Sequence, residues 1–267
     1  MNLAGIDTIL RIRSRGERMI FAENTRNSVG VAISGDHGDF NALYEGLHNV
    51  VGDESEFPGY ETPRLRVLGI CYDLRHAMMG DRDFVFVDNG RDEYGFWPED
   101  APDANLYLKI HVLWPEMLFV QLALNDFVQL YATQLARKFD KRSTMVHTNA
   151  VWDESLAITR LFQAAVARCL QDTVTPSSYR RIIRLMTRET VAIKDYTTQY
   201  VDILNESFLD MKPEVRRQRL SRIGKWLAER GGDYGQVKGA VKAAALHYGV
   251  REDDIAAPVH YPEVIEW

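Results

Sequence analysis

The chain has 267 residues, of which 46% are hydrophobic, 26% charged and 10% aromatic, and its formal net charge is −6. This composition excludes disordered and fibrous proteins and provides enough apolar residues for a sizeable core, in one large domain or two smaller ones. The acidic balance does not imply that the chain as a whole binds nucleic acid.

The two cysteines indicate a reducing compartment. Cys71 and Cys169 lie far apart, each inside an apolar run, which predicts buried free thiols rather than a disulfide framework. Residues 1–18 carry no apolar core of signal-peptide length, and no apolar run of transmembrane length occurs in the sequence. We therefore expect a cytoplasmic protein without a membrane partner.

The N-terminal part begins with a predicted hairpin and helix. Residues 19–22 and 28–34 are β-rich apolar runs separated by the polar segment ENTRN, a pattern typical of two paired strands. The next segment predicts a helix that Asp36 or Asp39 caps and Gly52 ends. Its apolar residues recur at steps of three and four, at Phe40, Leu43, Leu47 and Val50.

The segment 64–80 permits two interpretations. Residues 64–70 are expected to form a strand and the remainder to Met79 a short helix, although a strand that continues through Leu74 fits nearly as well. Two further strands are predicted at 84–87, closed by an Asn89-Gly90 turn, and at 106–114.

Helices dominate the rest of the chain. Pro115 is expected to open a central, largely buried helix. The following helices are predicted within 152–172, from 176 to about 211 with a break near 189–194, and within 213–230 and 237–248. The sequence thus predicts an α+β fold. We expect a small N-terminal α/β sheet domain at 1–114, a mostly helical domain at 115–250 and an extended acidic tail at 251–267.

Charge is distributed unevenly along the chain. Residues 1–110 hold 11 Lys and Arg against 19 Asp and Glu, whereas residues 174–250 hold 14 against 8. The acidic part could pack against the basic helices, either within the chain or in a second subunit. Alternatively, the basic helices could contact phosphates, although no nucleic-acid motif accompanies them. The arginines proposed for such anion contacts are Arg181, Arg184, Arg188, Arg216, Arg219 and Arg222.

A first candidate site lies where the second strand meets the first helix. Asp36 and His37, together with Asp81 from a later turn, offer the carboxylate and imidazole ligands of a divalent metal. Helix capping is the competing explanation for Asp36.

A second candidate site is the stretch LGICYDLRHAMMGDRD at 68–83. If it is helical, Asp73 and His76 stand three residues apart and could form a carboxylate–imidazole pair that acts as a general base, with Arg75 beside them. If it is extended, Asp73 and Arg75 share a side and His76 points away. A structural Asp–Arg or Asp–His pair is the alternative, and His111 is expected to be a core or boundary histidine.

Together with VAISGDHGDFNALYEGLHNVVGDE, this stretch resembles a family of bacterial proteins of unassigned function, over about residues 28–90. The resemblance implies a bacterial or phage origin and no particular activity.

Three functions follow from these patterns. The first is a non-enzymatic interaction or regulatory protein, an accessory subunit that binds a protein partner or itself and needs no cofactor. The second is a metal-assisted hydrolase of a phosphodiester or nucleotide, in which Asp36, His37 and Asp81 hold the metal and Asp73, Arg75 and His76 do the chemistry. The third, less favoured, is nucleic-acid binding through the arginine-rich helices. Nucleophile-elbow, phosphate-loop and dinucleotide-binding patterns do not occur in the sequence.

Overall fold

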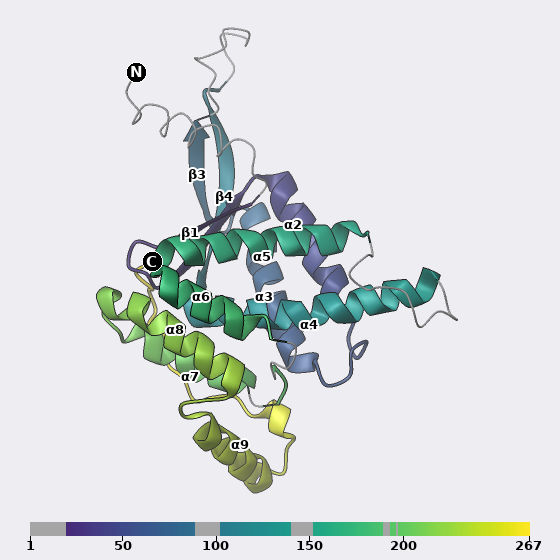
Figure 1. Ribbon diagram of the computed structural model, residues 1–267, viewed down its shortest axis with the longest axis vertical. Coiled ribbons are helices and arrows are strands. Elements are labelled where there is room, and N and C mark those ends of the chain that lie inside the picture. Colours follow the sequence, from purple (N-terminus) through teal and green to yellow (C-terminus); the bar gives the residue numbers. More distant parts are fainter. Residues whose placement is uncertain (1–19, 89–101, 140–151, 189–192, 196) are drawn as a thin grey trace.

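A sheet at the N-terminal end of the chain is covered by helices (Figure 1). The structure is a computed structural model and describes residues 20–88, 102–139, 152–188, 193–195 and 197–267. Four antiparallel strands pair in the order β1-β2-β4-β3. The expected α+β class is therefore confirmed.

The first two strands form the predicted hairpin. β1 (Phe21–Asn24) pairs antiparallel with β2 (Gly30–Gly35). In the turn between them, the Thr25 hydroxyl accepts hydrogen bonds from the backbone N–H groups of Val29 and Gly30, at 3.1 and 3.0 Å. These bonds satisfy buried donors that the strands leave unpaired. Every residue of β2 is buried, so this strand runs through the interior.

Helix α2 (His37–Val51) has the capping predicted for it. The Asp36 carboxylate accepts from the Asp39 N–H at 2.8 Å, and the Asp39 carboxylate accepts from the Asp36 N–H at 3.0 Å. Gly52 follows the last turn with a φ of 71°, in the left-handed region that favours glycine. The four apolar residues expected on the inner face are all buried: Phe40, Leu43, Leu47 and Val50.

Helix α3 (Glu61–Met78) occupies the segment where we expected a strand at 64–70, so that prediction was wrong. A strand would place Leu65 and Val67 on the same side, yet Leu65 is 62% exposed and Val67 is fully buried. The buried positions follow the helical period instead. They are Pro63, Val67, Ile70, Cys71, Leu74 and Ala77.

The other two strands were both predicted. β3 (Asp83–Asp88) pairs with β4 (Ala104–Leu113), which also pairs with β2. β4 is therefore an inner strand, and β3 lies at the edge of the sheet. The predicted Asn89-Gly90 turn lies outside the described residues.

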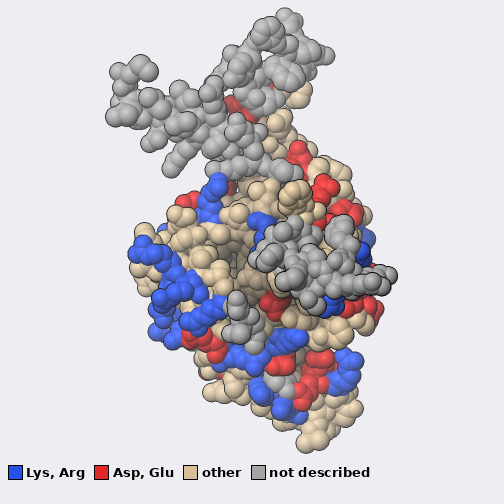
Figure 2. Space-filling model, turned by 45° about the vertical axis from the view of Figure 1, so that its right-hand side comes forward, with Lys and Arg blue, Asp and Glu red and all other residues tan. Residues whose placement is uncertain are grey.

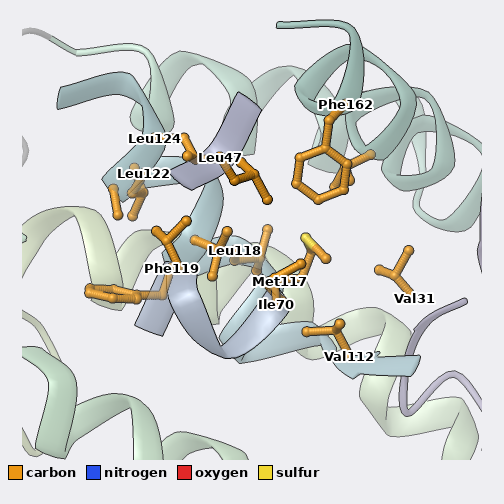
Figure 3. Packing of buried hydrophobic residues seen from close by; sticks show 14 of the residues in the cluster. Val31, Leu47, Ile70, Val112, Met117, Leu118, Phe119, Leu122, Leu124 and Phe162 are labelled. Carbon is orange, nitrogen blue, oxygen red and sulfur yellow. The ribbon is translucent and has the colours of Figure 1, made fainter. Parts of the chain in front are cut away.

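The central helix α4 (Trp114–Phe139) joins the two parts of the chain. It packs against β2, β4, α2 and α3 on the N-terminal side and against α5, α7 and α8 on the C-terminal side. Buried side chains from before and after residue 114 form one hydrophobic cluster. Figure 3 shows Val31, Leu47, Ile70, Leu118 and Phe162 pointing into this shared interior. The sheet and the C-terminal helices are thus stabilised by a common core.

The predicted C-terminal helices are present, with a break between α6 and α7 where the sequence indicated one. α5 packs against α2 and β1, and α6 packs against α8. In Figure 1, α9 lies at the end of the molecule opposite the β3–β4 hairpin. The elements are α5 (Glu154–Thr173), α6 (Pro176–Met186), α7 (Thr197–Leu209), α8 (Pro213–Glu229), α9 (Tyr234–Tyr248) and the 3-10 helix η3 (Glu252–Asp254).

The C-terminal tail is extended from residue 255 onward and returns from η3 to the sheet. Along α7, the Glu206 carboxylate accepts from the backbone N–H of His260 at 2.8 Å. Near β1, the Asn27 side chain donates to the carbonyl of Glu266 at 3.2 Å. The tail therefore holds α7 and the β1–β2 turn together.

Both cysteines are free and buried, as predicted. Burial raises the pKa of Cys71 and of Cys169 to about 12. Within the described part of the chain, no helix combines the length and the apolar character that a membrane crossing requires.

Candidate functional site

The residues proposed for catalysis lie on the last turns of α3. The His76 ring contacts the Tyr72 ring in a tilted arrangement with 4.0 Å between ring centroids, and its Nδ1 is 2.9 Å from the Tyr72 carbonyl oxygen. Asp73 binds a different partner: Arg82 donates to its Oδ1 from Nε at 3.1 Å and from Nη2 at 2.8 Å. Asp73 and His76 therefore do not form the expected general-base pair.

The third member of that group, Arg75, is exposed. No hydrogen bond or ion pair involves its side chain among the residues that the structure describes. The structural alternative, an Asp–Arg pair, is present with Arg82 as the partner of Asp73, and about a third of each side chain is exposed. This pair ties the end of α3 to the start of β3.

The residues proposed as metal ligands are separated. Asp36 is occupied by the capping box of α2, and Asp81 is exposed in the turn after α3. Burial raises the pKa of Asp39 to about 6, and the nearby charge of Asp36 adds to the shift. Over the described residues, no three His, Cys, Asp or Glu side chains are grouped so that they could hold a metal ion. The structure thus does not gather Asp36, His37 and Asp81 into a site.

Asp73 and Asp81 do line a common cavity of about 520 Å³ between α3, β3, β4 and the tail. The histidine in this cavity is His111, whose Nδ1 is 3.4 Å from an Asp83 carboxylate oxygen. Its ring stacks on Trp267 with 5.0 Å between centroids. Burial lowers the pKa of His111, which favours its neutral form. The cavity also contains Arg82 and Lys109, so its opposite charges largely offset one another.

The sequence predicts that His111 is a core or boundary histidine, because it lies on an alternating strand. Trp267, the residue that covers it, comes more than a hundred positions later in the sequence. No local pattern links the two, and only the docked tail brings them together.

The helices α6 and α8 lie side by side and run in the same direction. A Cβ atom at Gly224 of α8 would be 3.4 Å from Ile182 of α6. Toward the C-terminal ends of both helices, Arg188 Nη1 is 3.1 Å from Glu229 Oε1. These two contacts show that the helices pack against each other, and both carry arginines at exposed positions.

We call the arginines of α6, of the residues just after it and of α8 the α6–α8 arginine face, and define it by Arg181, Arg184, Arg188, Arg219 and Arg222. All are exposed except Arg219, which is half-buried. Arg188 pairs with Glu229, and the Arg222 guanidinium lies 5.8 Å from the centre of the Trp226 ring. The other three guanidinium groups have no acidic partner within the described parts of the chain. Figure 2 shows Lys and Arg gathered on the side where α6 and α8 lie.

Arg216, also proposed as an anion contact, has a structural role instead. It is only 8% exposed. Its guanidinium donates to the carbonyl oxygens of Phe208 and Leu209 at the end of α7, at 3.2 and 2.8 Å, and to that of Asn27 at 2.9 Å. Arg216 therefore ties the end of α7 to the turn between β1 and β2.

The suggested pairing of the acidic part with the basic helices within one chain is not seen at this face. Among the described residues, no ion pair joins an arginine of α6 or α8 to an acidic residue of the first 114 positions. Asp36 and Asp39 instead form the capping box of α2, and Asp73 of α3 pairs with Arg82.

A polar network between α3, α4 and α7 was not predicted. Arg66 Nη1 is 2.9 Å from Glu116 Oε2, and its Nη2 is 2.5 Å from Asp202 Oδ1. Asn205 Nδ2 donates to Glu116 Oε2 at 2.9 Å. Burial raises the pKa of Glu116, and the charge of Arg66 opposes that shift. No sequence pattern indicates this network, because Glu116 is 50 residues from Arg66 and the segment around Arg66 is predicted to be a strand.

Comparison with known proteins places the chain in a family. Neither the curated proteins nor the solved structures contain a match to it. A family model described as a domain of unknown function (DUF6904) matches residues 20–267. The match covers the sheet, all the described helices and the tail, and so extends well beyond the segment 28–90 that carried the resemblance. The chain therefore belongs to the DUF6904 family, a family of domains of unknown function.

Proposed function

We propose that this protein is a non-enzymatic binding protein that holds an anionic macromolecule on the α6–α8 arginine face. The observation that carries the proposal is a set of exposed guanidinium groups, from two packed helices, without acidic partners among the described residues. Like charges held close together repel one another, and an anionic ligand relieves that repulsion. Arginine also suits this role because it donates several hydrogen bonds in a fixed geometry to carboxylate or phosphate.

The hydrolase alternative has less support from the geometry. Asp73 is paired with Arg82, and His76 is held against Tyr72. A general base needs a free acceptor within reach of the proton that it removes. Because Asp73 and His76 are not hydrogen-bonded to each other, they do not form a carboxylate–imidazole pair that could act as a general base.

In this proposal the protein acts in the cytoplasm as an accessory or regulatory subunit, of bacterial or phage origin. The free thiols of Cys71 and Cys169 fit a reducing compartment.

Self-association through the β3–β4 hairpin is the second part of the proposal. Phe84 and Phe86 are 61% and 68% exposed on the edge strand, and their rings touch edge to face at 5.8 Å between centroids. Exposed aromatic side chains on an edge strand favour contact with another chain. We expect light scattering to report a dimer or larger assembly whose mass falls toward the monomer in F84S/F86S. If the variant had the same mass as the unmodified protein, self-association through the β3–β4 hairpin would be ruled out.

The arginine face is tested with fluorescein-labelled heparin, a polyanion with no defined structure. The variant R181Q/R184Q/R222Q removes three charges of the face. The matched control R26Q/R75Q/R137Q removes three exposed arginines elsewhere, with the same change in net charge. We expect the face variant to lose about tenfold or more in affinity near 0.1 M salt, and the control less than about twofold. Equal losses, or no binding by the unmodified protein, would overturn the proposal.

A further inference from the structure

We infer that two copies of this chain join through their β3 strands, which pair antiparallel about a twofold axis at Val85 and continue the sheet from one copy into the other. This inference rests on the self-association proposed above and names the strand and the register that carry it. Three features support it: the edge position of β3, the apolar face of the β3–β4 hairpin and the order of residues along the strand.

One side of β3 has no partner strand among the described residues. β3 pairs with β4 at each position from Asp83 to Asp88, and it ends the sheet. This pairing runs without a bulge, and β3 contains neither lysine nor proline. Bulges, lysine and proline are the features that commonly protect the edge of a sheet from a second chain. In Figure 1 the hairpin extends beyond the helices, where another strand can approach it.

The hairpin also carries an apolar face that is largely exposed. Phe84 lies opposite Leu108 and Phe86 opposite Leu106, so these four side chains share one face of the sheet. Ile110 points to the same face, because residues two apart on a strand point the same way. Ile110 is fully buried in the core, yet Leu106 is 50% exposed and both phenylalanines are more exposed than that. The core-facing side of the sheet thus continues past the helices with little cover from the described residues.

The geometry of an antiparallel pair limits the registers that two identical strands can adopt. Backbone N–H and C=O groups point to the outer side of a strand at every second residue. A residue of β3 therefore pairs with its own equivalent or with a position an even number of residues away, and opposite residues lie on the same face. Two registers keep most of β3 paired, one centred on Val85 and the other on Phe86.

The register centred on Val85 gives the better side-chain pairs. It places Phe84 of each copy opposite Phe86 of the other, so two aromatic pairs form on the apolar face. The register centred on Phe86 forms a single aromatic pair and places each Phe84 opposite an Asp88 carboxylate. Aromatic pairs across strands stabilise a sheet, whereas a carboxylate loses hydration beside an aromatic ring. The strand is thus most self-complementary about Val85.

The charges at the two ends of β3 favour an antiparallel arrangement. Arg82 directly precedes the strand and Asp88 ends it. The Arg82 guanidinium binds Asp73 of its own chain, and a third of its side chain is exposed. In the register centred on Val85, Arg82 of one copy lies opposite Asp88 of the other. A parallel pair in register would instead set like charges side by side, which destabilises a sheet.

One unlike pair accompanies this register, with Asp83 of each copy opposite Val87 of the other. The Asp83 carboxylate lies 3.4 Å from His111 Nδ1 of its own chain, and 70% of its side chain is exposed. Asp83 can therefore keep both its hydration and its contact with His111 when a valine lies beside it.

Disulfide cross-linking of single-cysteine substitutions tests the inference. The native Cys71 and Cys169 do not compete, because both are buried and burial raises their pKa to about 12. In the predicted register, the two Cβ atoms at position 85 lie about 4.5–5.5 Å apart, close to the roughly 3.5–4.5 Å of a disulfide. The two positions 87 are four residues out of step, about 13 Å along the strands, and are too far apart to cross-link.

We expect V85C to form at least about fivefold more disulfide-linked dimer than V87C under mild oxidation with copper phenanthroline, as measured on non-reducing gels. V87C is a matched control, since Val85 and Val87 are both half-buried and lie on the same face of β3. An equimolar mixture of D83C and V87C should cross-link although neither does so alone, because positions 83 and 87 lie opposite each other. This mixture tests the register even if V85C does not fold.

Other results would contradict the inference. Equal cross-linking of V85C and V87C would indicate a parallel pair or random collision, and cross-linking only between V85C and V87C in a mixture would indicate the register centred on Phe86. If F84S/F86S lowers the mass in light scattering but no predicted cross-link forms, the register is wrong and self-association through the hairpin stands. If the unmodified protein is a monomer, both are wrong. Heparin binding tests the arginine face separately.

Discussion

Around α2 and α3, several carboxylates and arginines are bound to groups of the same chain, whereas most guanidinium groups of the α6–α8 arginine face have no such partner among the described residues. Asp36 and Asp39 cap a helix, Asp73 pairs with Arg82, and Arg66 binds Glu116. Arg181 and Arg184 have no ion pair among the described residues. The paired charges around α2 and α3 contribute to the stability of the fold, whereas the unpaired arginines can bind a ligand. Substitutions in the two regions should therefore change different quantities.

The largest effect is expected at Arg66. In Arg66→Met, the carboxylates of Glu116 and Asp202 remain partly buried without their partner, and we expect a loss of about 3 kcal/mol in the free energy of unfolding. Arg75→Met, on the same helix but exposed, should change it by less than about 0.5 kcal/mol. Urea denaturation measures both values. Similar losses in the two variants would mean that the Arg66 network is not a structural element.

Neighbouring residues of α8 provide a second test. Arg216→Gln leaves three carbonyl oxygens without their guanidinium donor, and we expect a loss of about 2 kcal/mol in unfolding free energy. Arg217→Gln, at an exposed position, should cost less than about 0.5 kcal/mol. If both variants unfold at the same urea concentration, the structural assignment of Arg216 is wrong.

A smaller effect is expected for Asp73 and Arg82. About a third of each side chain is exposed, and exposed pairs contribute about 0.2–1 kcal/mol. A double-mutant cycle with Asp73→Asn and Arg82→Gln should give a coupling energy within that range. A coupling well above about 2 kcal/mol would place the pair with the buried Arg66 network rather than with surface pairs.

The smallest effect concerns pH. The folded pKa of Asp39 is about 6, above its ordinary value of 3.8, so the folded state holds a proton that the unfolded state releases between these values. The contribution of Asp39 to the free energy of unfolding is therefore fully present below about pH 4 and is lost as the pH rises through about 6. Solvent screening should keep the change below about 1 kcal/mol. The difference in unfolding free energy between the unmodified protein and Asp39→Asn should shrink over this range.

Glu45→Gln, an exposed carboxylate on the same helix, is the control for this measurement. Its unfolding free energy should follow that of the unmodified protein across the same pH range. If the unfolding free energy of Glu45→Gln instead changed with pH as that of Asp39→Asn does, the pH dependence could not be attributed to Asp39.

The predictable parts of the fold were those whose information is local. Helix α2 followed from the spacing of Phe40 and Leu47 and from the capping position of Asp36. The strand predicted at 64–70 was wrong because Leu65 and Val67 alternate only by coincidence. The buried residues follow the helical period, which becomes clear only when Ile70 and Leu74 are included.

The sites were harder to predict than the elements, since partners come from distant segments. The sequence placed Arg181 and Arg216 in one arginine-rich group, but one is exposed and the other is buried against the end of α7. Asp73 was expected to pair with His76 or Arg75, and the turn after α3 brings Arg82 to it instead. Which of these residues pair or become buried depends on the tertiary fold and is not visible in the local sequence.

Late segments of the chain, α5 and the C-terminal tail, cover its first strands and helix, and this affects how the protein folds during synthesis. β1 and α2 are covered by α5, and Gly46 lets Ile158 approach closely. The β1–β2 turn binds the tail through Asn27 and Glu266, which are 239 residues apart. On the ribosome, the earliest strands must therefore wait, with apolar surface uncovered, until α5 has emerged. We expect nascent chains that stop before residue 154 to recruit chaperones, and longer ones to be released from them.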